Sequence, residues 1–302
     1  MRKNYKNLAS KKADSLVYTV KESVELLPFL LEMMTGSGRN AVKSILTRGQ
    51  VTVDGKMVKQ HNHPLLPGQA VEIVKNQTAI KGETLVGVSI LHEDEDIIVI
   101  NKDAGLLSVA SKNETEMTAY RQVRDYVSNG NPNKRIFIVH RLDKDTSGVM
   151  LFAKSEEIKE ALQANWSEVV KERTYIALVE GVVWKKAGKI SSWLKESKTF
   201  KVYSNPTDNG GQHAITHYKT LQSNKQFSLL EVQLETGRKN QIRVHMEDLG
   251  HPIVGDKRYG ATGNPLKRLG LHATRLVLTH PRTGELVRFE ADAPKSFYAK
   301  SK

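Results

Sequence analysis

The nine residues HRLDKDTSG at positions 140–148 constrain this chain most, because they place dense charge between two apolar runs. IFIV precedes them and VMLFA follows. Short apolar runs bounded by turn-forming residues predict buried strands. Asp, Thr, Ser and Gly suit a turn between such strands. His140, Arg141 and Asp143 are not required by any turn, so they are candidates for chemistry.

Asp143 is the strongest of these candidates. It lies between Arg141 and Lys144, and nearby positive charge favours the ionised form of a carboxyl group. An ionised aspartate on a loop fixed by two buried strands suits a nucleophile or a base. A calcium loop is the alternative for DKDTSG, but the twelfth position from Asp143 is Lys154 instead of glutamate. The intervening apolar strand also fails as a ligand loop, which excludes calcium.

The length and composition predict a two-domain globular protein in a reducing cytoplasm. The chain has 302 residues, 39% of them hydrophobic and 26% charged. It has no apolar run long enough to span a membrane, and its basic N-terminus lacks the apolar core of a secretory signal. The absence of cysteine excludes disulfides, thiol nucleophiles and cysteine-ligated metal sites.

The charge balance predicts a polyanion as partner. Lys and Arg number 46 against 33 Asp and Glu, which gives a net charge of +13 and a pI of about 9.6. Such a balance is typical of nucleic-acid-binding proteins. The alternative is a basic enzyme with no nucleic-acid partner, because composition alone is not specific.

The N-terminal part predicts a small basic domain. A flexible basic arm is expected over 1–15, a compact unit over 16–75 and a linker over 76–87. Within the unit, helices are expected in SVELLPFLLEMM and GRNAVKSILTRG, followed by a hairpin with the turn Asp54-Gly55 and a closing strand. Residues 1–80 carry 12 basic and 6 acidic side chains, so 12 − 6 = +6.

Three basic residues of this unit are predicted to contact RNA. Arg39 and Lys43 lie one helical turn apart, and Arg48 stands before Gly49. The alternative is a solvated helix face. The order of two helices, RGQVTVDGKMV and PGQAVEIV resembles the α-L RNA-binding domain first described in a ribosomal small-subunit protein. That resemblance favours contact with RNA phosphates.

Residues 88–302 predict an α+β domain with a mixed, largely antiparallel central sheet. A second charged cluster, at 234–256, has a helix expected from near Lys239 to Gly250. Arg238, Lys239 and Arg243 surround its N-terminus, where free amides and the helix dipole attract anions. The segment is expected to hold a phosphate or to offer an arginine to a carboxylate elsewhere, and Arg238 and Lys239 are predicted RNA contacts. The alternative is surface charge on a helix. His213 and His217 lie on an expected strand, which separates them by about 13 Å and argues against zinc.

Four segments, in this order and spacing, resemble the pseudouridine synthases of the RluA type over about residues 90–292. They are HRLDKDTSGVMLFAKS, KERTYIALVEG, TGRKNQIRVHMEDLGHPIVGDKRYG and LHATRLVLTHPRTGE. The resemblance implies the pseudouridine synthase fold, conversion of uridine to pseudouridine in RNA, and no cofactor or metal. A monomer is the simplest expectation. Large-subunit ribosomal RNA and transfer RNA are both open as substrates.

The resemblance also implies roles for individual residues. Asp143 corresponds to the catalytic aspartate, which either attacks the anomeric carbon or removes a ribose proton. Arg243 corresponds to the arginine paired with that carboxylate. Tyr175 corresponds to the aromatic residue that stacks on the flipped uracil and takes part in proton removal from carbon five. Arg141 is expected to displace or hold the flipped nucleotide. A base must leave the stack before its glycosidic bond is reached.

This sequence departs from the family pattern at two positions. Asp103, in NKDAG, stands where the family usually has proline. Asn240, in GRKNQIR, stands where histidine is usual. Neither position is expected to carry the chemical step, but both could change loop rigidity or RNA contacts.

Two other functions compete with a synthase. A non-catalytic RNA-binding protein could keep the fold as a platform, although the presence of Asp143, Tyr175 and Arg243 argues against it. A glycosidase-like hydrolase would need two opposed carboxylates several ångströms apart. Asp143 and Asp145 lie on one short loop instead.

Overall fold

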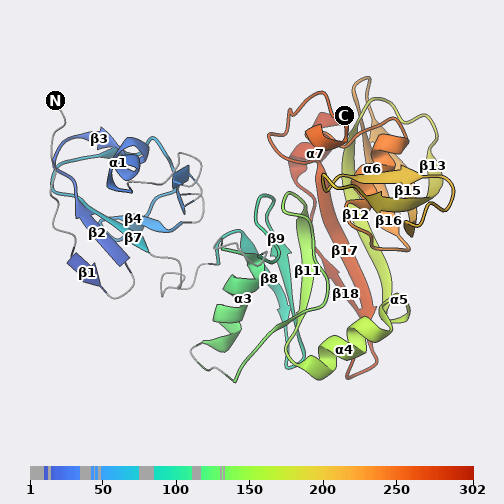
Figure 1. Cartoon of the computed structure of the whole chain (residues 1–302), viewed down its shortest axis with the longest axis horizontal. Helices are drawn as coiled ribbons and strands as arrows, with labels where there is room; N and C mark the ends of the chain where they lie inside the picture. Colours follow the sequence, from blue (N-terminus) through green and yellow to red (C-terminus); the bar gives the residue numbers. More distant parts are fainter. Residues whose placement is uncertain are drawn as a thin grey trace. The chain divides into compact units, whose positions relative to one another are not determined.

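The chain folds into two compact units (Figure 1). The structure is a computed structural model, and it describes residues 10–12, 15–34, 42–43, 45–46, 49–74, 85–110, 117–129, 131 and 133–302. The smaller unit comprises Met1–Gly87, Ala110–Met117 and Arg121–Gly130. The larger unit comprises Val88–Val109, Thr118–Tyr120 and Asn131–Lys302.

The smaller unit is built on a five-stranded sheet with the order β1-β2-β7-β4-β5. Its strands are β1 (Ser10–Lys12), β2 (Ser15–Thr19), β4 (Val51–Val53), β5 (Lys56–Met57) and β7 (Ala70–Val74). Two short strands, β3 (Val24–Glu25) and β6 (Pro64–Leu65), pair beside helix α1 (Leu26–Met33). The buried leucines of α1 pack in one core with Val51 and Val53 of β4 and Val71 of β7.

The predicted hairpin is confirmed between β4 and β5. Its two turn residues, Asp54 and Gly55, have φ values of 49° and 78°. Positive φ at both central positions is the requirement of the tight turn that matches strand twist, and Asp-Gly is a preferred pair for it. The described parts of the second expected helix, 42–43 and 45–46, are helical.

Two expectations for this region differ from the structure. Sequence analysis predicts no strand before the first helix, whereas SLVYT forms β2 and its backbone pairs with β7. Part of the arm expected over 1–15 is also a strand, because Ser10–Lys12 form β1 and pair antiparallel with β2. Arg39, Arg48 and 75–84 lie outside the described residues.

The larger unit confirms the α+β class with a mixed, largely antiparallel sheet. The main path of its sheet has the order β14-β13-β15-β16-β12-β17-β11-β9-β8, with β10 added to β11 and β18 to β17. Among the described strands, only β11 and β17 pair in parallel. The bounds are β8 (Val88–Glu93), β9 (Ile97–Lys102), β10 (Phe137–Ile138), β11 (Ser147–Ala153), β12 (Val170–Glu180), β13 (Ala187–Glu196), β14 (Val202–Asn205), β15 (Gln212–Ser223), β16 (Phe227–Leu234), β17 (Leu271–Thr279) and β18 (Leu286–Glu290).

The described helices of the larger unit are α4 (Glu156–Ala164), α5 (Trp166–Val169), α6 (Gln241–Asp248), the 3-10 turn η1 (Lys257–Tyr259) and α7 (Lys295–Lys300). Helix α3 (Ala119–Ser128) begins in the larger unit, and its residues from Arg121 onward belong to the smaller one. The predicted cap of α4 is confirmed, because the Ser155 hydroxyl accepts from the Ile158 amide at 3.2 Å. No helix in the described ranges is both long and apolar enough to cross a membrane.

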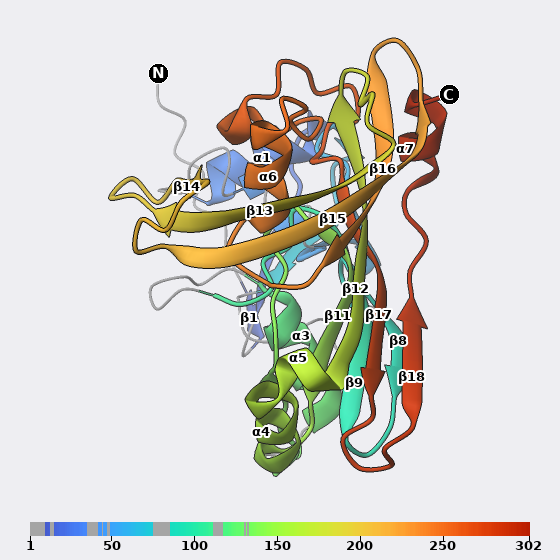
Figure 2. The ribbon, with the colours of Figure 1, turned by 90° about the vertical axis from the view of Figure 1, so that its right-hand side faces the viewer.

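The alternation of β12 decides which side chains reach the functional side of the sheet. Figure 2 shows α4, α5 and α6 on one side of the long strands and α7 on the other. Ala177 and Val179 pack with α6, whereas Ile176 and Leu178 pack with α7. Because side chains alternate along a strand, Tyr175 lies on the α6 side, where it packs against the same cluster as Ala177.

Candidate active site

One pocket of about 470 Å³ in the larger unit gathers most of the predicted site residues. Its wall comes from the loop that carries Asp143, from β12 with Tyr175, and from the start of α6 with Arg243. Arg141 and Arg238 also line it. Residues 100 positions apart in the chain therefore meet at one cavity.

The loop of Asp143 is held mainly by the segment that follows β9. The Ser108 hydroxyl donates to the Leu142 carbonyl at 2.6 Å and accepts from the Leu142 amide at 3.2 Å. The Gly105 amide donates to the Lys144 carbonyl at 2.9 Å. The expectation of two buried flanking strands is half right: β11 is buried, but β10 has two half-buried residues. Sequence analysis does not identify Ser108 as a residue that holds this loop, because Ser108 and Leu142 are 34 positions apart in the sequence.

Lys102 is a buried cation beneath this loop. Its ammonium donates to the carbonyls of Asp103 at 2.9 Å, Leu106 at 2.7 Å and Lys144 at 3.1 Å. Burial lowers its pKa to about 8, against the raising effect of nearby carboxylates, of which Asp145 is the largest. Lys102 thus joins the loop of Asp143 to the loop that contains Asp103. The proline-to-aspartate departure at 103 leaves this bond intact, since a backbone carbonyl accepts it.

The end of the HRLDKDTSG segment is fixed by packing. Gly148 has φ 117°, and a Cβ there would lie 2.0 Å from the Ala273 carbonyl oxygen on β17. Ser147 lies 2.7 Å from Nδ1 of His272 and accepts from Arg268 at 2.6 Å. Only glycine permits the close approach of β11 and β17 at this point.

His140 has a structural contact in this arrangement. Its Nε2 accepts from the Leu151 amide at 3.0 Å. Burial, with a smaller effect from the charge of Arg173, lowers the pKa of His140 to about 4. The ring is therefore neutral at pH 7, and it anchors the segment before Asp143 to β11.

Arg243 links two carboxylates. Its Nε and Nη2 donate to Asp256 at 2.6 and 2.8 Å, and Nη1 lies 3.5 Å from Oδ2 of Asp143. Burial alone would lower the pKa of Arg243, but the hydrogen bonds and charge of Asp256, aided by Asp143, raise it. The pairing with Asp143 is thus at the limit of hydrogen-bond distance, and Asp256 is the firmer partner. Sequence analysis did not single out Asp256, although it ends the segment GHPIVGD.

Asn240, which stands where the family usually has histidine, has a left-handed backbone conformation. Its φ is 55°, in the left-handed region, which asparagine tolerates better than most residues. Its Oδ1 accepts from Arg243 Nη1 at 3.1 Å, and its Nδ2 donates to the Tyr259 hydroxyl at 3.0 Å. The guanidinium of Arg243 also lies 4.9 Å from the Tyr259 ring centroid. Asn240 therefore helps to orient Arg243.

Tyr175 forms an uncharged aromatic wall of the pocket. Burial raises its pKa, Asp143 adds to the rise, and Arg173 opposes it. The phenol is consequently protonated at pH 7. The ring can pack against a base and donate a hydrogen bond, whereas a phenolate base is disfavoured in this resting state.

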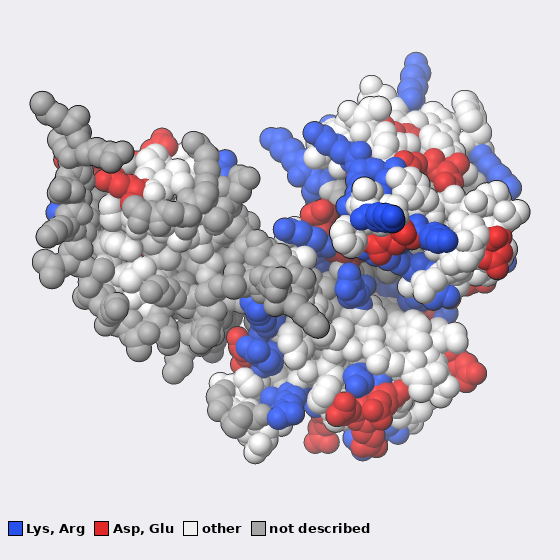
Figure 3. All heavy atoms as spheres, viewed as in Figure 1, with Lys and Arg blue, Asp and Glu red and all other residues white. Residues whose placement is uncertain are grey.

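Two of the remaining predicted RNA contacts line the pocket, and two others do not. Arg141 and Arg238 are exposed and line the pocket, and Arg238 Nε donates to the His213 carbonyl at 3.0 Å. Lys239 is exposed, bonds Glu196 and lies outside the pocket lining. Lys43 is an exposed helical residue of the smaller unit. Figure 3 shows Lys and Arg gathered on the half of the larger unit that carries α6 and β15, with acidic side chains interspersed.

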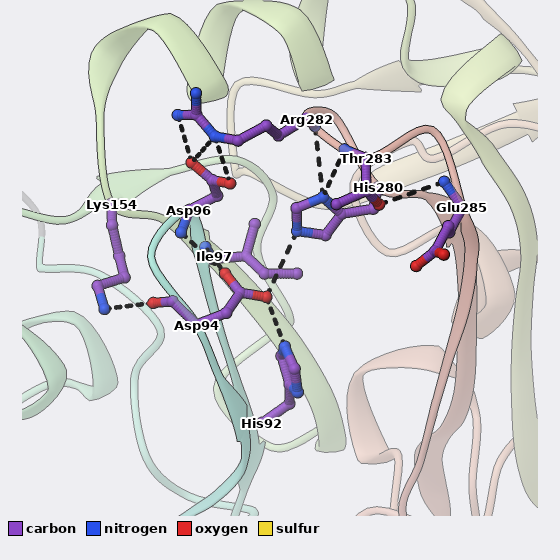
Figure 4. Close-up of polar contacts among 9 residues, drawn as sticks. All are labelled: His92, Asp94, Asp96, Ile97, Lys154, His280, Arg282, Thr283 and Glu285. Carbon is purple, nitrogen blue, oxygen red and sulfur yellow. Dashed lines mark hydrogen bonds and ion pairs between the residues drawn. The ribbon is translucent and has the colours of Figure 1, made fainter.

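A second cluster of potential metal ligands lies apart from this pocket. Asp94, Asp96 and His280 have ligand atoms within 4.8 Å of one another. Asp96 already forms a bidentate pair with Arg282 at 2.6–2.8 Å, and Asp94 bonds His92 at 2.6 Å (Figure 4). The cluster joins the β8–β9 turn to the β17–β18 turn. Because its carboxylates already have partners, a role in holding these turns together fits it better than metal binding.

Comparison with known proteins assigns the fold and the family. The family profile described as RNA pseudouridylate synthase matches residues 96–248. The uncharacterised RNA pseudouridine synthase YlyB of Bacillus subtilis is 34% identical over 88% of this chain and 89% of its own length. Ribosomal large subunit pseudouridine synthase D of Haemophilus ducreyi is 30% identical over 93% of each chain.

A solved structure supports the same assignment. Human RNA Pseudouridylate Synthase Domain Containing 4 matches with a TM-score of 0.58 and 26% identity, over 70% of this chain and 90% of that chain. The predicted pseudouridine synthase fold is confirmed. The chain belongs to the RNA pseudouridylate synthase family, whose members are isomerases that convert uridine to pseudouridine in RNA.

Proposed function

We propose that this protein isomerises uridines of large-subunit ribosomal RNA, with Asp143 as the reactive group. The observation that carries this proposal is the meeting of Asp143, Tyr175 and Arg243 in one pocket. The pocket volume, about 470 Å³, suits a small ligand of nucleotide size.

The chemistry requires the uridine to leave the RNA stack and enter the pocket. The bond between ribose C1′ and uracil N1 breaks, and its electron pair stays on the uracil. Asp143 either bonds to C1′ through a carboxylate oxygen or removes the proton from C2′. The uracil then turns and its C5 bonds to C1′, while the bond between Asp143 and C1′ breaks or, in the other route, the proton returns to C2′. C5 loses its hydrogen as a proton and N1 takes up a proton, so Asp143 is regenerated. The product has the same atoms as the substrate.

The groups around Asp143 support these steps by position. Asp256 holds Arg243, and Arg243 places its Nη1 3.5 Å from one oxygen of the Asp143 carboxylate. Tyr175 offers a neutral face for stacking of the base. Arg141 and Arg238 are exposed and line the pocket, as suits arginines that hold the flipped nucleotide or neutralise phosphates.

The choice of ribosomal RNA rests on the name of the Haemophilus ducreyi relative, which aligns over nearly the whole chain. We further propose that residues 16–75 act as an α-L RNA-binding domain in which Arg39, Lys43 and Arg48 contact phosphates. This would add salt-dependent affinity. The cytoplasmic location, the monomeric state and the absence of a metal or cofactor stay predictions.

The substrate is tested with RNA from cells that lack this gene. Ribosomal and transfer RNA are incubated separately with the purified protein, and new pseudouridines are mapped. The proposal predicts new sites in large-subunit ribosomal RNA. Modification confined to transfer RNA would contradict the substrate class while leaving the activity intact.

A further inference from the structure

Arg173, on β12, is a positively charged residue in the pocket wall, and the proposed function gives it no role. It lines the same cavity as Asp143 and Tyr175. Its Nη2 donates to the backbone carbonyls of Glu235 at 2.9 Å and Leu234 at 3.4 Å. Within the part of the chain that the structure describes, it forms no ion pair with a carboxylate.

This lack of a counter-charge distinguishes Arg173 from Arg243, the other half-buried arginine of the pocket lining. Arg243 pairs with Asp256, Arg275 with Glu172 and Glu290, and Arg282 with Asp96. A charge removed from water without a partner is costly. Burial lowers the pKa of Arg173, and the charge of Arg238 adds to that effect. Without a ligand, the positive charge of Arg173 in the pocket wall is therefore not neutralised by a carboxylate of the described residues.

The local structure makes room for this guanidinium. A Cβ on Gly237 would lie 2.5 Å from Nη1 of Arg173, so the glycine leaves the space that the side chain occupies. The two carbonyls at the end of β16 bind Nη2 alone. No hydrogen bond to a described residue occupies Nε or Nη1, so these donors remain for a ligand.

Arg173 lies on the same side of β12 as Tyr175, the residue proposed to stack on the uracil. Arg173 lies two residues before Tyr175 on the same strand, and alternation puts both on the α6 side. Both side chains line the same pocket. Arg141 and Arg238, by contrast, are exposed, as suits arginines that meet phosphates.

We propose that Arg173 binds the negatively charged oxygen of the uracil after its glycosidic bond has broken. This inference rests on the proposed function. When the C1′–N1 bond breaks, the electron pair that stays on N1 is shared with the O2 and O4 oxygens of the ring. Because the uracil is neutral before that step, Arg173 would bind the transition state more strongly than the substrate. Such differential binding accelerates the reaction.

The test separates the rate of the chemical step from RNA binding. Wild type, Arg173→Met and Arg173→Ala are compared in single-turnover pseudouridine formation at saturating RNA, and their Kd for the same RNA is measured. The rate should fall on the order of 100- to 1,000-fold, with Kd changed less than about threefold. Millimolar guanidinium should restore part of the rate of Arg173→Ala. Arg275→Met, which removes a paired arginine outside the pocket lining, should keep the wild-type rate.

Two results would overturn the inference. One is an unchanged rate in both variants. The other is weaker binding with a shallower salt dependence and a normal saturated rate, which would assign Arg173 to a phosphate. An inactive wild type would instead contradict the proposed function. If the Arg173 variants do not fold, Gly237→Ala tests the inference instead. The added Cβ displaces the guanidinium of Arg173, while the protein keeps the positive charge of that residue. A lower rate at unchanged Kd supports the inference, and an unchanged rate overturns it.

Discussion

The bidentate pair between Asp256 and Arg243 is expected to control both stability and activity. Asp256→Asn removes the charge and one of two acceptors at 2.6 and 2.8 Å. The side chains of the pair are 2% and 15% exposed, so solvent screens it little. Breaking such a buried pair costs about 3–5 kcal/mol. Since Arg243 keeps bonds to Asn240 and Asp143, we expect the lower end of that range.

The activity should fall for a separate reason. Without the charge of Asp256, Arg243 has Asp143 as its remaining carboxylate partner in the pocket, and the guanidinium is free to move towards it. A misplacement of about 1 Å in a catalytic group can reduce a rate about 100-fold. The loss should appear in the rate at saturating RNA, because Arg243 acts on the reacting carboxylate.

The assay combines thermal unfolding with single-turnover kinetics. A loss of about 3 kcal/mol corresponds to a decrease in Tm of about 6–12 °C for a unit of this size. Asp96→Asn is the matched control, because Asp96 pairs with Arg282 in the same bidentate manner away from the pocket. The control should lose stability and keep the saturated rate. A normal saturated rate in Asp256→Asn would refute the positioning of Asp143 through Arg243.

Two further predictions concern packing and pH. Gly148→Ala should destabilise the larger unit by about 3 kcal/mol or more and abolish activity, because its Cβ overlaps the Ala273 carbonyl. Gly284→Ala, also at positive φ but with nothing within 4 Å, should cost far less in urea unfolding. The hydrogen bonds and charge of Arg282 lower the pKa of Asp96 despite burial. Its contribution to stability is thus present above the unfolded pKa of about 4 and lost as pH falls through the lower folded value. Urea unfolding between about pH 5 and 2 should show a shallower decline in Asp96→Asn, and equal slopes would contradict this origin.

The sequence predicts those features that depend on local pattern. The apolar run VMLFA is a fully buried strand, Asp54-Gly55 forms the hairpin turn, and Ser155 caps a helix. Each of these signals lies within a few residues of the element it determines. The charged segment at 140–148 also indicates the place of the pocket, because few structural roles require such charge between strands.

The features that sequence analysis missed depend on contacts between distant segments. Asp256 reaches Arg243 across a turn, and Ser108 reaches Leu142 over 34 positions. Lys102 ends an apolar strand, where a lysine normally reaches solvent, yet three backbone carbonyls bind its ammonium. Arg173 occurs in KERTY among other charges, and only the sheet shows which face it occupies. Periodicity does not specify such pairings.

The central claim is that Asp143 carries out the reaction, and tritium release tests it most directly. RNA with tritium on uracil C5, taken from cells that lack this gene, is incubated with wild type, Asp143→Asn and Asp145→Asn. Asp145 provides the same charge change on the same loop. The new bond to C5 expels its hydrogen, so wild type and Asp145→Asn should release tritium, while Asp143→Asn should fold, bind RNA and release none. Release by Asp143→Asn at the wild-type rate would contradict the account.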